Sequence, residues 1–209
     1  MTDLLLIRKA IHLERCGILH DAPFTPARLA ADWVVRGGNW SVEDGWLTGR
    51  NPLNAAGMVT SRQSYFGNVM LDFTACTVPP STHDIDWMWS GSWDETTGAR
   101  GVGYVGGMEG WWEGKVGFEK TPTYLPTIAT PLFDFEPGRA YHIQSGSIDG
   151  HAFIFVDGRL LLEFLDPDPI DTTRYGTIGF EAYASHMQLR DLVVRQIAWS
   201  AREQAYPEV

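Results

Sequence analysis

Short runs of β-type residues, each bounded by Gly, Pro, Asn or Asp, follow one another from Trp33 onward at spacings of roughly 8 to 12 residues. This pattern is typical of a sandwich or a barrel. Long helical periodicity is scarce: residues 26–32 favour a short helix, and residues 4–14 fit either a helix or an extended strand. The predicted strands are 33–35, 40–42, 46–48, 57–61, 68–77, 84–90, 101–105, 111–118, 141–147, 151–156, 160–165, 177–183 and 187–197.

Two Asp-Gly pairs predict tight hairpins. Asp149-Gly150 and Asp157-Gly158 each stand between apolar runs, which is the strongest short-range hairpin signal. Together they predict a three-strand meander. Residues 121–137 carry four prolines and cannot form a central strand, so we predict a long loop there, with a second rigid loop at Asp-Pro-Asp-Pro, residues 166–169.

Tryptophan and carboxylate side chains are concentrated in residues 83–119, where five of the nine tryptophans fall between positions 87 and 112. In a strand, successive side chains point to opposite faces, so Asp84 and Asp86 share one face and Trp87 and Trp89 share the other. Burying two carboxylates is unfavourable, whereas tryptophans suit a sandwich interior. We therefore predict that the acidic face is accessible to solvent.

Composition is that of a globular protein. The chain has 209 residues, 44% of them hydrophobic and 12% aromatic, and it fits one β-sandwich domain over 1–209 with its core at about 16–197. A formal net charge of −10 without a basic cluster excludes nucleic acid as an expected partner. No secretory signal or membrane span is predicted, so we expect a cytoplasmic protein, no membrane partner, and free thiols at Cys16 and Cys76.

Several segments resemble the concanavalin A-like lectin/glucanase superfamily. They are Asp32-Trp33, the run from Gly38 to Leu47, the run from Ile154 to Arg159, Glu163 to Pro167, Gly176 to Glu181 and Leu189 to Val194. Within the superfamily the chain looks like the bacterial 3-keto-disaccharide hydrolase family and a family found beside rhamnogalacturonan utilisation genes. The resemblance implies an all-β, two-sheet antiparallel jelly-roll sandwich with little helix. It also implies a carbohydrate ligand on the concave sheet.

The sequence departs from one pattern of that superfamily. Laminarinase-like members carry Glu-x-Asp-x-x-Glu on one strand, and the nearest match here, residues 84–89, has Trp89 in place of the final carboxylate. A standard retaining glucanase is therefore not predicted.

Carboxylates on several strands are the candidate catalytic groups. Paired carboxylates can divide into an acid with a raised pKa and an ionised partner, as glycoside hydrolysis requires. They can equally bind a hard cation such as Ca²⁺, or form a solvated or arginine-paired acidic face. The candidates are Asp84, Asp86, Glu113, Glu181 and, as an auxiliary base, His186.

Aromatic side chains beside these acids are the candidate sugar platform, since a pyranose stacks on an aromatic ring while its hydroxyl groups bond to acids. Trp111 and Tyr183 are the main candidates, and Lys115 lies nearby in the sequence. If the strand faces were reversed, His83, Trp87 and Trp89 would contact the ligand instead.

These observations predict an enzyme, a glycoside hydrolase or lyase, that cleaves an oligosaccharide or a modified glycoside such as a 3-keto sugar. The alternatives are a lectin-like binding protein, which needs the platform but no tuned acid, and a purely structural sandwich. No cofactor is predicted beyond an optional divalent cation, and assembly into homo-oligomers is left open.

Overall fold

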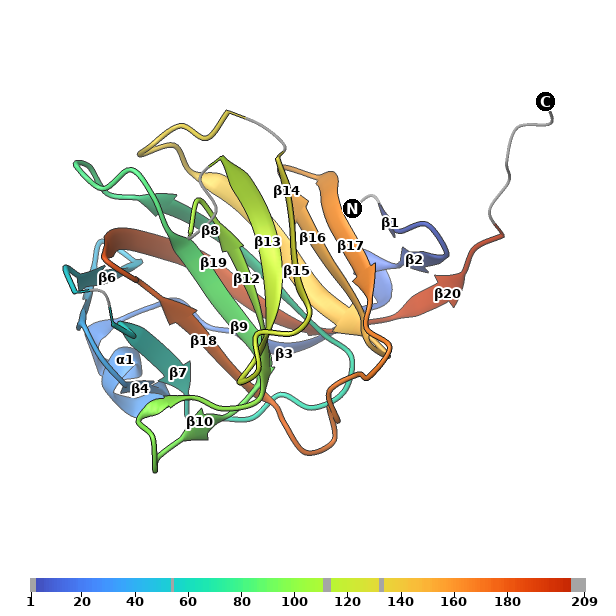
Figure 1. Cartoon of the computed structure of the whole chain (residues 1–209), viewed down its shortest axis with the longest axis horizontal. Coiled ribbons are helices and arrows are strands. Elements are labelled where there is room, and N and C mark those ends of the chain that lie inside the picture. The colour runs from blue at the N-terminus through green and yellow to red at the C-terminus, as the bar shows by residue number, and fades with distance from the viewer. Residues whose placement is uncertain (1–2, 54, 111–113, 132–133, 204–209) are drawn as a thin grey trace.

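The computed structural model describes residues 3–53, 55–110, 114–131 and 134–203. Two antiparallel sheets lie face to face (Figure 1). The seven-stranded sheet has the order β14 (Thr127–Pro131), β13 (Lys115–Thr121), β12 (Gly103–Met108), β9 (Ile85–Gly91), β18 (Thr177–Glu181), β7 (Met58–Ser61) and β4 (Trp33–Val35). The eight-stranded sheet is completed by β3 (Gly17–Asp21) on β19, and its path runs β17 (Arg159–Leu165), β16 (His151–Val156), β15 (Tyr141–Ile148), β8 (Val69–Thr77), β19 (Ser185–Gln196), β6 (Trp46–Asn51) and β5 (Asn39–Glu43).

The main core lies between the two sheets. Trp87 and Trp89 point into it from β9 and have no exposed surface. The ring of Phe73, on the facing sheet, lies 5.7 Å from that of Trp87 and 5.2 Å from that of Phe180. The indole N–H of Trp89 donates to Ser147 Oγ at 3.1 Å, which satisfies a polar group that burial would otherwise leave unpaired. The predicted tryptophan face is therefore the core face.

Both predicted hairpins are present. Asp149 and Gly150 have φ of 51° and 79°, and Asp157 and Gly158 have φ of 51° and 75°. Positive φ at both central residues is what a two-residue turn needs to match the twist of its strands, and Asp-Gly tolerates it. The turns join β15, β16 and β17 into the expected meander.

One segment contradicts the sequence prediction, and another settles an alternative that the sequence left open. The prediction of one long loop over 121–137 is wrong, because this segment contains the strand β14. The exclusion of a central strand was correct: β14 is an edge strand, where proline is tolerated, and Pro131 is its last residue. Residues 4–14 form no α-helix and instead hold β1 (Leu4–Leu5), β2 (Lys9–Ile11) and the start of a 3₁₀ turn, Leu13–Arg15. The short helix α1 (Pro26–Asp32) is where it was predicted.

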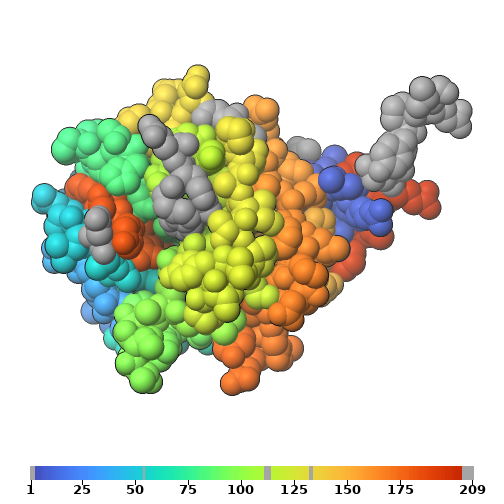
Figure 2. Space-filling view, in the orientation of Figure 1, coloured from blue at the N-terminus to red at the C-terminus, as the bar shows by residue number. Residues whose placement is uncertain are grey.

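The beginning and the end of the described chain meet in one small sheet, in which β2 pairs with both the first and the last strand. β1 and β2 form a small sheet with β20 (Trp199–Ala201), and the blue and red segments lie together at one end of the molecule (Figure 2). Residues 4–11 are called the N-terminal arm here. Its residues Leu6 and Ile11 pack with Phe153 and Phe155 in a second apolar cluster, on the outward side of the eight-stranded sheet. Among the described helices, none is long and apolar enough to cross a membrane.

A polar chain of contacts fastens this arm to the sheet. Lys9 Nζ lies 3.2 Å from His151 Nδ1, and His151 Nε2 lies 2.9 Å from Glu163 Oε2. The other carboxylate oxygen of Glu163 accepts the backbone N–H of Ile7 at 3.1 Å. Burial, then the charge of Lys9, lowers the pKa of His151, so its ring is neutral at neutral pH.

Acidification should loosen the arm. Because the folded-state pKa of His151 lies below its ordinary value of 6.5, its contribution to stability is present above that value and is lost as pH falls through the folded pKa. We expect amide hydrogen exchange over residues 4–11, corrected for intrinsic rates, to accelerate several-fold between about pH 7 and pH 5. In a His151→Gln variant, which cannot gain a proton, the exchange should not depend on pH. Equal acceleration in both proteins would show that protonation of His151 does not loosen the arm.

Candidate functional site

Four carboxyl groups and one guanidinium meet on the outward face of the seven-stranded sheet. They line a cavity of about 470 Å³, here called the acid cavity. Asp86 reaches it from β9, Glu181 from β18 and Glu119 from β13, while Asp84 stands just before β9. The lining residues are His83, Asp84, Asp86, Arg100, Gly110, Glu119, Tyr124, Glu181, Tyr183 and Ala184.

Strand register brings the carboxyl groups together. Asp86 stands directly opposite Glu181 across the β9–β18 pair, so the two Cβ atoms are about 4.5–5.5 Å apart. On its other side Asp86 faces Gly107 of β12, and a Cβ at that position would lie 2.1 Å from Asp86 Oδ1. Gly107 therefore leaves the space that the Asp86 carboxyl group occupies, which explains a glycine in a buried strand.

Asp84 is fixed by the chain segments around it. Its backbone is in the left-handed region, with φ of 72°, and its N–H donates to the carbonyl oxygen of Glu109 at 2.9 Å. Its Oδ2 accepts the backbone N–H of Tyr183 at 2.6 Å and the hydroxyl of Ser185 at 3.1 Å. Asp84 thus ties the start of β9 to the turn between β18 and β19.

Arg100 is the cation of the acid cavity. It belongs to β11 (Ala99–Arg100), which pairs with β10 (Trp93–Asp94). Its Nη2 lies 3.1 Å from Glu119 Oε1, and its Nη1 lies 3.1 Å from Glu181 Oε2. The Nη1 and both of these carboxylate oxygens nevertheless lack the alignment of a hydrogen bond, so the contacts are ion pairs held mainly by charge.

The cavity also holds polar atoms that have no hydrogen-bond partner among the described residues. Besides the atoms of the Arg100 pairs, Asp86 Oδ1 is buried and unbonded. Native structures leave few buried polar atoms unsatisfied, and those that are unsatisfied often belong to sites that bind or react. These atoms can hydrogen-bond to the hydroxyl groups of a ligand.

Burial raises the pKa of every carboxyl group in the cluster. Asp84 and Glu119 are raised to about 7, in each case chiefly by burial; backbone N–H donation from Tyr183 opposes the shift at Asp84, and Arg100 opposes it at Glu119. Burial, and then the charge of Asp84, lifts the pKa of Asp86 well above its usual range. Glu181 is raised by burial against the charge of Arg100. The cluster therefore keeps protons at neutral pH.

The carboxyl groups of Asp84 and Asp86 influence each other. Burial raises the pKa of both, and the charge of Asp84 raises that of Asp86 further. In such a pair one acid can keep its proton while its neighbour is ionised.

Two tyrosines stand at the mouth of the cavity. Tyr183 is 42% exposed and Tyr124 is 51% exposed, so their rings are available to a ligand. An aromatic ring with a polar tip suits a sugar, whose C–H face stacks on the ring.

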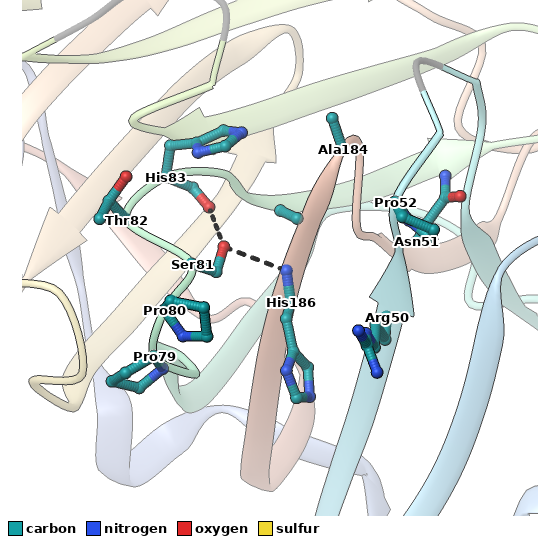
Figure 3. A pocket seen from close by; sticks show the side chains of 11 residues that line it. Arg50, Asn51, Pro52, Pro79, Pro80, Ser81, Thr82, His83, Ala184 and His186 are labelled. Atoms are coloured by element: carbon teal, nitrogen blue, oxygen red, sulfur yellow. Dashed lines mark hydrogen bonds between the residues drawn. The ribbon is translucent and has the colours of Figure 1, made fainter.

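A second cavity, of about 520 Å³, adjoins the first (Figure 3). His186 and Arg50 lie side by side in it, and His83 and Ala184 line both cavities. Ser81 Oγ accepts the backbone N–H of His186 at 3.1 Å. Burial, then the charge of Arg50, lowers the pKa of His186.

The structure brings together many, but not all, of the predicted site residues. Asp84, Asp86, Glu181, Tyr183 and His83 line the acid cavity, and His186 lines the adjoining one. Lys115 is exposed and is outside both linings. Trp111 and Glu113 lie outside the described residues.

Two expectations about the strand faces need correction. Trp87 and Trp89 cannot contact a ligand as the reversed faces required, because both are fully buried in the core. The acidic face is directed away from the core, as predicted, but it is not open to solvent: Asp84 is 2% exposed and Asp86 is 1% exposed. Beside Asp86, Met58, Met88 and Val105 form a small apolar cluster on the same face, covered in part by Trp93 of β10.

Arg100, Glu119 and Tyr124 were not among the predicted site residues. Alternation along residues 115–121 places Glu119 opposite to the apolar Val116 and Phe118, and this signal could have found it. Nothing local marks Arg100 or Tyr124. In the described part of the chain, no group of three or more His, Cys, Asp or Glu side chains is arranged to hold a metal ion.

No protein-family model matches the chain, and no curated protein matches it in sequence. Solved structures do match. A Bacillus subtilis protein of unknown function with a galectin-like fold has a TM-score of 0.70 at 15% identity, covering 87% of this chain and 97% of that one. The carbohydrate-binding module CBM66 from Bacillus subtilis has a TM-score of 0.60 at 15% identity, over 78% of this chain and 94% of the module. An alginate lyase in complex with an alginate trisaccharide has a TM-score of 0.54 at 16% identity, over 86% and 95% of the two chains.

These likenesses define the class of fold. The chain is a galectin-like, two-sheet β-sandwich of the concanavalin A-like kind, which confirms the fold predicted from the sequence. The narrower resemblance to 3-keto-disaccharide hydrolases and to the rhamnogalacturonan-associated family remains a prediction, since identities of 15–16% carry the fold alone.

Proposed function

We propose that the protein binds an oligosaccharide in the acid cavity and cleaves one of its glycosidic bonds by acid/base catalysis. The observation that carries the proposal is a cavity lined by carboxyl groups that keep protons at neutral pH and hold unbonded oxygen atoms. A solvated structural acid would be ionised and would need neither feature. The carbohydrate-binding module and the alginate lyase among the solved neighbours support the ligand class.

In this mechanism Asp86 is the proton donor. Its carboxyl group is protonated, and a general acid must carry a proton when the glycosidic oxygen leaves. The charge of the neighbouring Asp84 favours the protonated form of Asp86, while Tyr183 N–H and the Ser185 hydroxyl hold Asp84 in place. Glu181, directly opposite Asp86 and beside Arg100, is the second carboxylate, which acts as base or nucleophile.

Binding without cleavage is the second candidate function. Arg100 already engages both Glu119 and Glu181, as it would in a cluster whose role is to shape the cavity. A lectin needs the tyrosines and the hydroxyl-bonding oxygens but no donated proton. The two functions share the ligand and differ in turnover.

Product analysis by mass spectrometry separates these functions. The purified protein should cleave a member of a panel of plant-wall oligosaccharides and 3-keto-glycosides. If the summed mass of the products exceeds that of the substrate by one water, the reaction is hydrolysis; if the two masses are equal, it is elimination. Binding without products, measured on the same panel, would establish the lectin function instead. A folded sample that neither binds nor cleaves would contradict the proposal.

The pH profile of that turnover should fall on the alkaline side. The pKa values of Asp84 and Glu119 are about 7 and burial raises that of Asp86 well above its usual range, so the cluster loses its protons as pH rises from neutrality. Because a general acid acts only when protonated, kcat should decline through the range above about pH 7. A rate that stays constant from about pH 6 to pH 10 would contradict Asp86 as the acid.

A further inference from the structure

The cavity that holds His186 differs in charge from the acid cavity beside it. Arg50 is the only lining residue with a permanent charge, and the lining contains no Asp or Glu. In the whole chain acids outnumber basic residues, with a formal net charge of −10. A cationic cavity without acids is therefore not what the average composition would produce.

Arg50 and His186 are forced to be neighbours. They are direct partners in the register of β6 and β19, so their side chains share one face with Cβ atoms about 4.5–5.5 Å apart. Figure 3 shows the two side chains side by side at the cavity. Burial, then the charge of Arg50, lowers the pKa of His186, so Arg50 supplies the positive charge of the pair.

Arg50 differs from several other arginines in its charge partners. Over the described ranges of the chain, its guanidinium forms no ion pair with a carboxylate, whereas Arg36, Arg100, Arg139 and Arg195 each do. An exposed guanidinium with its donors free is suited to bind a carboxylate through two parallel N–H groups.

The rest of the lining suits the body of a sugar. Pro52, Pro79 and Pro80 provide apolar ring surfaces, and Thr82 adds a hydroxyl group. The volume, about 520 Å³, lies within the ordinary range for small-molecule sites.

The two cavities adjoin each other and share lining residues. His83 and Ala184 line both. Ser185 lines the Arg50–His186 cavity, and its hydroxyl donates to Asp84 of the acid cavity. One oligosaccharide can therefore place adjoining units in the two cavities.

We propose that the Arg50–His186 cavity binds the carboxylate of a uronic acid unit, and that the adjoining unit of the same oligosaccharide occupies the acid cavity. This inference rests on the proposed function, because it assigns the substrate class of that site. Arg50 supplies the charge, His186 the neighbouring ring nitrogens, and the prolines the surface under the sugar. The ligand class is an acidic oligosaccharide.

The test compares uronate trisaccharides with the same trisaccharides after their carboxyl groups have been reduced to alcohols. Galacturonate, glucuronate and mannuronate series are titrated by calorimetry at low ionic strength. One series should bind the wild-type protein at least roughly tenfold more tightly in its acid form, since a hydrogen-bonded ion pair is lost on reduction. A sulfated neutral trisaccharide distinguishes a general anion site from a carboxylate site.

Arg50→Met should bring the affinity for the acid form down to that for the reduced form. Arg50→Lys should recover part of the difference, because it keeps the charge but not the paired N–H groups. The matched control is Arg159→Met, at an exposed arginine of β17 that lines neither cavity, which should bind like the wild type. Circular dichroism confirms that each variant is folded.

The inference would be overturned if the protein bound acid and reduced trisaccharides with equal affinity. It would also be overturned if Arg50→Met kept the preference for the acid form, or if the sulfated sugar bound more tightly than every uronate. Turnover is scored separately. Cleavage of neutral sugars without a preference for acids would overturn this inference and leave the proposed cleavage intact. Acid-selective binding without any products would support the anion site and overturn the cleavage.

Discussion

Replacing Arg100 with methionine should lower the free energy of unfolding by about 3–5 kcal/mol at about pH 8, the usual effect of removing one partner of a buried ion pair. The Arg100 side chain is 13% exposed, and those of Glu119 and Glu181 are 4% and 2% exposed. Without the guanidinium, both carboxylates face the cost of burying an unpaired charge. Urea denaturation of the wild-type and variant proteins measures the difference.

The loss should shrink in acid. Arg100 opposes the raised pKa values of Glu119 and Glu181, so its removal raises both pKa values further. For a group whose folded pKa lies above its unfolded value, stability is greatest below the unfolded value and is lost as pH rises through the folded one. At about pH 4 both glutamates are largely neutral and the variant should approach the wild type in stability.

A matched variant tests the cause. Combining Arg100→Met with Glu119→Gln and Glu181→Gln removes the stranded charges, so it should recover much of the stability at about pH 8. A loss that is the same at both pH values and is not recovered would show that Arg100 stabilises by packing its side-chain stem rather than by charge.

The difference between what the sequence predicted and what the fold shows has a physical pattern. Strand alternation is local, so the positions of Trp87 and Trp89 and both Asp-Gly hairpins follow from a few residues each. The outward direction of Asp86 followed in the same way. Its burial did not, because a carboxyl group that keeps its proton avoids most of the free-energy cost of burying a charge.

The remaining site depends on contacts between distant segments. Arg100 lies on a two-residue strand, and its role arises from meeting Glu119 and Glu181 across the sheet. Tyr124 lies in the proline-rich segment that precedes β14, where no periodicity exists to orient a side chain. The sequence analysis grouped His186, as an auxiliary base, with Asp86 in one site. However, β19 belongs to the other sheet, so His186 occupies the adjoining cavity. Sheet membership cannot be read from alternation alone.

Asp86→Asn should reduce kcat by about 10²–10⁴-fold on whichever substrate the panel identifies, the usual contribution of a general acid. Asparagine has nearly the same shape and fits the space beside Gly107, so binding should change little. The amide is neutral, as the protonated Asp86 is, but it has no acidic proton to transfer. Single-turnover kinetics and calorimetry measure the two effects separately.

The same substitution should stabilise the fold increasingly as pH rises above the ordinary pKa of an aspartate, 3.8. The folded-state pKa of Asp86 is raised, so its stability is greatest below that ordinary value and is lost as pH rises through the folded pKa; an amide removes this loss. Stability gained together with activity lost is the expected signature of an acid retained for its chemistry.

Asp72→Asn is the matched control, at an aspartate on the outward side of the other sheet. Although burial opposes it, hydrogen bonding to His142, Gln144 and Arg195 lowers the pKa of Asp72, so this carboxylate stabilises the fold in its charged form. Its amide variant should lose stability at about pH 8 and keep full turnover. If Asp86→Asn behaved like Asp72→Asn, with stability lost and turnover kept, Asp86 would be a structural residue and the acid cavity would be a binding site.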